Sequence, residues 1–68
     1  METTLLILKN RDQYIRVRGD DYQVCNLDKA SVFPMEKLEQ VKRHIETMEQ
    51  NGFERPVMAK LILREEPF

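Results

Sequence analysis

The sequence contains few of the residues that build cross-linked or reactive sites. Its one cysteine, Cys25, excludes a disulfide within the chain, and its one histidine, His44, has no Cys/His cluster around it. Its two glycines, Gly19 and Gly52, stand where a turn and a helix end are expected, so no glycine-rich phosphate loop is present. We therefore predict no metal and no cofactor.

Long apolar runs and an excess of one charge are also absent. The first apolar run ends at Leu8 and follows no basic region, so neither a signal peptide nor a membrane span is expected. The 11 basic and 12 acidic residues are interspersed and give a net charge of −1. Attraction of the whole molecule to nucleic acid or to an anionic membrane is therefore weak. These features predict a cytoplasmic protein without membrane contact.

The chain has 68 residues, of which 41% are hydrophobic, so it forms one domain with a small core. Residues 65–68 are expected to be a frayed tail. With neither disulfides nor metal, a domain of this size depends on tight packing or on self-association for its stability.

Three segments near the N-terminus have strand patterns. Residues 3–9 form a continuous apolar run, which predicts a central strand covered on both faces. Residues 14–18 alternate, with Ile15 and Val17 on one side, and residues 22–26 form a shorter, more polar edge strand. Turn-prone residues separate the three segments, so we predict a three-stranded antiparallel meander.

An amphipathic helix is predicted from Phe33 to Phe53. Pro34 suits the first turn and places Phe33 and Leu38 at the spacing of a hydrophobic staple. Gly52 suits the left-handed position at the helix end, with Phe53 reaching back in a Schellman-type contact. The apolar stripe recurs every three or four residues, at Leu38, Val41, Ile45 and Met48.

The final segment, residues 57–64, alternates as a strand, which makes the fold α+β with the order β-β-β-α-β and the helix on one face of the sheet. The strand order 3-2-1-4 places this last strand beside the first; the alternative places it beside the third through a right-handed crossover. The side of this strand assigned to the helix carries Val57, Ala59, Leu61 and Leu63. The other side carries Met58, Lys60, Ile62 and Arg64.

This assignment leaves apolar residues on the uncovered face, and monomers seldom expose a contiguous patch of that kind. We therefore predict a homodimer or a contact with another protein through that face or an exposed edge. The alternative is that Lys60 and Arg64 cover the apolar atoms with their own side chains. The predicted interface residues are Leu6, Leu8, Met58 and Ile62.

A second hypothesis is a weak nucleic-acid-binding face, because aromatic and arginine side chains on a sheet can stack bases and hold phosphates. Its residues are Tyr14, Arg16, Arg18 and Tyr22. The alternative is a solvated face on which the arginines pair with Asp12, Asp20 or Asp21.

No grouping of residues predicts catalysis. His44 has no nucleophile or orienting carboxylate on its side of the helix, so it is interpreted as a surface or boundary residue. Cys25 has no CxxC partner and is interpreted as a small packing residue, with an intermolecular contact or a reactive thiol as the alternative. The pairs Asp20–Asp21 and Glu65–Glu66 do not converge, because adjacent residues on an extended chain point to opposite sides. We predict that the protein is not an enzyme.

The stretch Asp28-Lys29-Ala30-Ser31-Val32-Phe33, placed between a hairpin and a helix, resembles the layout of small uncharacterised bacterial and phage-encoded α+β proteins. The resemblance covers about half of the chain and implies a phage or mobile-element origin and an accessory role. It carries no catalytic or binding residues to transfer.

Overall fold

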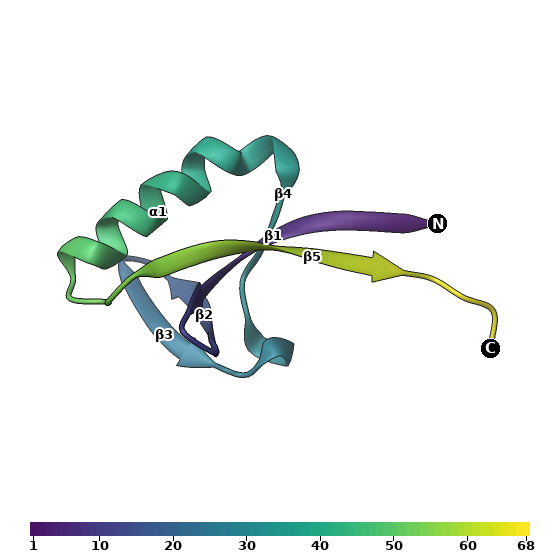
Figure 1. The fold of residues 1–68 in the computed structure, drawn as a ribbon, viewed down its shortest axis with the longest axis horizontal. Coiled ribbons are helices and arrows are strands. Elements are labelled where there is room, and N and C mark those ends of the chain that lie inside the picture. The colour runs from purple at the N-terminus through teal and green to yellow at the C-terminus, as the bar shows by residue number, and fades with distance from the viewer.

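The computed structural model describes all 68 residues as an α+β fold with one α-helix and a five-stranded antiparallel sheet (Figure 1). The elements are β1 (Glu2–Asn10), β2 (Gln13–Arg18), β3 (Asp21–Cys25), β4 (Val32–Pro34), α1 (Leu38–Gln50) and β5 (Pro56–Arg64). Two short 3₁₀ turns, η1 (Leu27–Lys29) and η2 (Met35–Lys37), lead into β4 and α1. The predicted meander, helix and final strand are all present, and β4 is an additional strand.

β1 is the centre of the sheet. One edge pairs with β5 over its whole length, from Glu2 opposite Arg64 to Asn10 opposite Pro56. The other edge is shared, since β2 pairs only with Lys9 and Asn10 and β4 pairs with residues 5–7. The predictions that the first strand is central and that the last strand lies beside it are confirmed.

β4 was missed because it is short and depends on contacts with distant residues. β2 leaves β1 after two residue pairs and is held instead by Ser31, just before β4. The Ser31 N–H donates to the Ile15 carbonyl at 3.1 Å, and the Ser31 hydroxyl accepts from the Val17 N–H at 2.8 Å. The edge of β1 beyond β2 is thereby free for β4, where Phe33 lies opposite Leu6.

The helix begins later than predicted and ends as predicted. Phe33 belongs to β4, and Pro34 is the cap of the 3₁₀ turn η2, so α-helical geometry starts only at Leu38. At the other end, the Phe53 N–H donates to the Met48 carbonyl at 3.0 Å. The Gly52 N–H donates to the Glu49 carbonyl at 3.2 Å, and Gly52 has a φ of 93°. This is the Schellman geometry that the sequence predicted.

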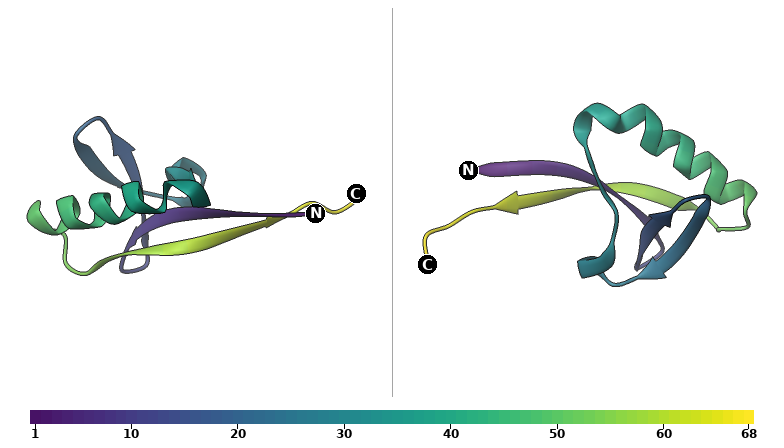
Figure 2. Two further views of the ribbon diagram at one scale, coloured as in Figure 1. Left: turned by 90° about the horizontal axis from the view of Figure 1, so that it is seen from above. Right: turned by 180° about the vertical axis from the view of Figure 1, so that it is seen from behind.

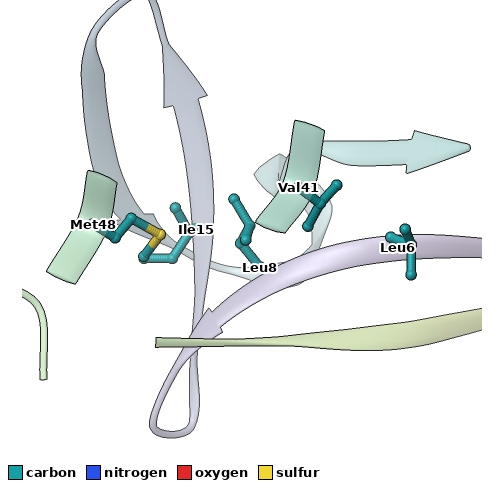
Figure 3. Packing of buried hydrophobic residues seen from close by; sticks show 5 residues of the cluster. All are labelled: Leu6, Leu8, Ile15, Val41 and Met48. Atoms are coloured by element: carbon teal, nitrogen blue, oxygen red, sulfur yellow. The ribbon is translucent and has the colours of Figure 1, made fainter. Parts of the chain in front are cut away.

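The main core lies between α1 and one face of the sheet. Figure 3 shows side chains from β1, β2 and α1 meeting there: Leu6, Leu8, Ile15, Val41 and Met48. With Ile7, which lies outside this cluster, only six hydrophobic side chains are buried in the whole molecule. α1 is neither long enough nor apolar enough to cross a membrane.

The predicted orientation of the last strand is wrong. Residues directly opposite each other in an antiparallel pair point to the same face. Because Met58 lies opposite Leu8 and packs against the core, the even-numbered residues of β5 face α1. Val57, Ala59, Leu61 and Leu63 therefore point away from the helix. Alternation separates the two faces of a strand, but it does not show which face the helix covers.

The start of β1 and the end of β5 extend beyond the rest of the fold. Figures 1 and 2 show them running together as a two-stranded ribbon, away from α1 and towards both termini. This ribbon makes the molecule elongated, with dimensions of 43 × 24 × 21 Å.

Candidate protein-binding surface

The face of the sheet that points away from α1, here called the far face, is apolar over β1, β4 and β5. Leu5 lies opposite both Pro34 and Leu61, and Ile7 lies opposite both Val32 and Ala59, so these side chains share the far face. The resulting apolar patch consists of Leu5, Ile7, Val32, Pro34, Val57, Ala59, Leu61 and Leu63.

The apolar patch is open to solvent in part: Ile7 at its centre is only 3% exposed, whereas four of its residues on β4 and β5 are exposed. Val57 is 50% exposed, and Val32 and Leu63 are each 49% exposed. The only helix packs against the other face, so no helix covers these residues. Lys60 and Arg64 cannot shield the patch in the way considered above, because they point to the helix side of β5. Exposed apolar side chains gathered on one face of a sheet are typical of protein interaction sites.

The predicted interface residues are not on this surface. Leu6 and Leu8 are 3% and 0% exposed and belong to the core, and Met58 is partly buried against it. Placing Leu6 and Leu8 on an open surface was wrong, because their side of β1 is the one beneath α1. Ile62 is 59% exposed and lies opposite Thr4 in the projecting ribbon.

The outer edge of β5 is also unpaired, since β5 has β1 as its only neighbour. The Glu65 N–H donates to the Met1 carbonyl at 3.2 Å, in the same register as the ladder. In an antiparallel ladder, residues alternate between pointing their peptide groups at the neighbouring strand and away from it. Residues 57, 59, 61 and 63 therefore bond to β1. The outward-pointing N–H and C=O groups are those of Met58, Lys60, Ile62 and Arg64.

Over β2 the far face becomes basic. Tyr14 lies opposite Lys9, whose Nζ is 4.8 Å from the centroid of the tyrosine ring. Arg16 and Arg18 follow on the same side and are exposed. Neither forms an ion pair, so the expected pairing with nearby aspartates is not seen.

The residues Lys9, Tyr14, Arg16 and Arg18 are here called the basic strip. Tyr22 does not belong to the basic strip, and grouping it there was wrong. It lies opposite Val17, on the helix side of the sheet. Its hydroxyl is 2.7 Å from His44 Nδ1, and its ring makes edge-on contacts with the rings of His44 and Phe53. The register of β2 and β3 decides this position, and the sequence alone does not reveal it.

Tyr22 and His44 pack against each other on the helix side of the sheet. Partial burial lowers the pKa of His44, and the positive charge of Arg43 lowers that pKa further. Nδ1 of the neutral ring can accept a hydrogen bond from the Tyr22 hydroxyl. The sequence predicted His44 as a boundary residue, and it did not predict Tyr22 as its partner.

The surface has two hollows. One, of about 480 Å³, is lined only by Arg11, Glu54 and Arg55, and the Arg11–Glu54 ion pair at 2.8 Å is 75% exposed on both sides. The other contains the half-buried Cys25 beside Tyr14 and Val24. No three His, Cys, Asp or Glu side chains come together as a metal site would require.

Comparisons with protein-family models, with curated proteins and with solved structures found no match.

Proposed function

We propose that the chain is a small non-enzymatic binding protein. It acts by contact with another protein or with its own copy, through the far face and the outer edge of β5. The observation that supports this proposal is the apolar patch, in which Val32, Val57 and Leu63 are about half exposed although only six hydrophobic side chains are buried in the whole molecule.

Energetics favours covering this patch. Full burial of a valine or leucine side chain contributes about 1.5–3 kcal/mol, so bringing half-exposed residues into an interface gains part of that for each one. Val32, Val57 and Leu63 are each about half exposed. A domain this small has little other apolar burial on which to draw.

The test compares two equally exposed residues. Leu63 lies in the apolar patch, and Val24 lies on β3, opposite Ile15 and so on the other face; both are 49% exposed. Tagged wild type, Leu63→Lys and Val24→Lys are compared by light scattering behind size exclusion and by affinity capture with identification of the bound protein. We expect Leu63→Lys to weaken the complex at least tenfold and Val24→Lys to leave it unchanged. The proposal is contradicted if the wild type is strictly monomeric and captures no protein that Leu63→Lys fails to capture.

We propose as a second candidate a weak nucleic-acid-binding function of the basic strip. It is favoured by Arg16 and Arg18, which are exposed and form no ion pairs, leaving their guanidinium groups free for phosphates. It is weakened by the loss of Tyr22 from that face. Fluorescence anisotropy with a labelled single-stranded oligonucleotide at low salt tests it: wild type should bind, and Arg16→Glu should abolish binding. Absence of binding by wild type removes this candidate.

A further inference from the structure

The outward-pointing peptide groups on the outer edge of β5 are arranged symmetrically about one residue. Its outward-pointing peptide groups belong to residues 58, 60, 62 and 64, a set centred on Leu61. A two-fold axis perpendicular to the sheet pairs a strand with its own copy antiparallel and keeps every side chain on its original face. An axis at Leu61 places Met58 opposite the partner's Arg64 and Lys60 opposite the partner's Ile62. In this register all the outward N–H and C=O groups of β5 bond to one another.

The registers with the axis at Ala59, Lys60 or Ile62 are less favourable. An axis at Lys60 places that lysine opposite its own copy, and an axis at Ile62 places Lys60 opposite the partner's Arg64, so like charges face each other in both. An axis at Ala59 places Ile62 opposite the partner's Pro56, which has no N–H to donate. The Leu61 register has no like charges directly opposite.

The same register continues the apolar patch across the edge. On the far face, Leu61 meets the partner's Leu61, and Ala59 meets the partner's Leu63. Leu63, which is 49% exposed in the single chain, thereby gains apolar neighbours. The projecting ribbon also benefits, because two isolated strands are only marginally stable and two ribbons together make a four-stranded sheet. Lysine on an edge strand often prevents pairing. The side chain of Lys60, however, stands on the helix side of the sheet and leaves the peptide edge free.

We infer that the partner of the β5 edge is a second copy of this chain, paired antiparallel about a two-fold axis at Leu61 to form one continuous sheet. This inference rests on the proposed function and makes it specific, since it names both the partner and the register.

Disulfide trapping tests the register directly. In a Cys25→Ser background, Leu61→Cys places two thiols in a non-hydrogen-bonded pair with Cα atoms about 4.5 Å apart, within disulfide range. Leu63→Cys is the matched control on the same face and strand. The two control thiols are four residues out of register, about 13 Å apart along the strand, which is too far for a disulfide.

Under mild oxidation we expect the cross-linked dimer to form at least tenfold faster with Leu61→Cys than with Leu63→Cys. Sedimentation velocity of the wild type should show a reversible dimer at micromolar to millimolar concentration. Equal or reversed cross-linking rates overturn the Leu61 register. A wild type that is monomeric throughout overturns the dimer. If the wild type is monomeric but captures another protein that Leu63→Lys does not capture, the proposed binding function is still supported.

Discussion

At the scale of single residues, the contact between Tyr22 and His44 ties the hairpin to the helix. The hydroxyl and the ring nitrogen are 2.7 Å apart, and the ring of Phe33 also lies beside the imidazole. Through these two contacts the His44 ring joins α1 to both β3 and β4. The Tyr22–His44 contact is the one side-chain hydrogen bond between sheet and helix.

We predict that Tyr22→Phe lowers the free energy of unfolding by about 0.5–1.5 kcal/mol, because the hydrogen bond to His44 is lost while the ring is kept. Tyr14→Phe is the control, since the Tyr14 hydroxyl forms no hydrogen bond within the protein. Urea denaturation at pH 7.5 measures both. Equal effects of the two substitutions would show that the 2.7 Å contact contributes nothing to stability.

We predict that stability falls as the pH is lowered from 7.5 to 5.5. The pKa of His44 is lowered in the native state by burial and by Arg43, from an ordinary value of 6.5. Below pH 6.5 the unfolded chain therefore binds a proton more readily than the native chain, so protonation favours unfolding. The full stability is present above pH 6.5 and declines as the pH falls towards the native pKa.

Urea denaturation at several pH values checks this dependence, with His44→Gln as the comparison. The variant lacks the titrating group, so its stability should change less between pH 7.5 and 5.5. A pH dependence of the same steepness in both proteins would show that other groups cause it.

At the scale of elements, the end of α1 is the part most directly encoded in the sequence. Gly52 takes a φ of 93°, which costs a residue with a Cβ about 1 kcal/mol or more. Space is not the constraint, because a Cβ added at Gly52 would meet no atom within 4 Å.

We predict that Gly52→Ala lowers the free energy of unfolding by about 1 kcal/mol through backbone strain alone. Asn51→Ala is the control, because Asn51 has a φ of −89° and no side-chain hydrogen bond. Thermal unfolding followed by circular dichroism distinguishes the two variants. If Gly52→Ala is as stable as wild type, the left-handed position is not limiting.

Elements defined by local patterns were predicted well, and elements defined by distant pairing were not. The apolar run in β1, the alternation in β2 and the glycine after α1 are all local signals. β4 has only three residues, including Pro34, and exists because Phe33 lies opposite Leu6. Pro34 lies opposite Leu5, at a position of the ladder where no N–H is required. No propensity argument finds such a strand without the pairing.

At the scale of the whole molecule, the main prediction from the sequence concerned an apolar surface on the side of the sheet without the helix. Such a surface exists, but its β5 residues, Val57, Ala59, Leu61 and Leu63, are those that had been assigned to the helix side. The error concerned a single choice, the side of β1 and β5 on which α1 packs. A single helix can cover only one face of the sheet, and only the packing of Leu8 and Met58 against the helix determines which face that is.

We predict that the melting temperature of the wild type rises with protein concentration, because association stabilises the folded chain by mass action. Leu63→Lys should melt at the same temperature at all concentrations, whereas Val24→Lys should behave as wild type. Scanning calorimetry over a hundredfold range of concentration measures this. A wild-type melting temperature that does not move would argue against self-association.

The pairing of β1 with β5 has a consequence for the order in which the chain folds. Residues 2–10 bond to residues 56–64, so the longest ladder in the molecule joins segments separated by almost the whole chain. Contacts between distant segments form slowly, because a long loop must close first. During synthesis on the ribosome, Leu6, Ile7 and Leu8 are made before β5, so their strand lacks this pairing partner until β5 has been made. The apolar segment Leu6–Leu8 therefore lacks its longest partner strand until β5 has been made, and an unpaired apolar strand is a starting point for misassembly.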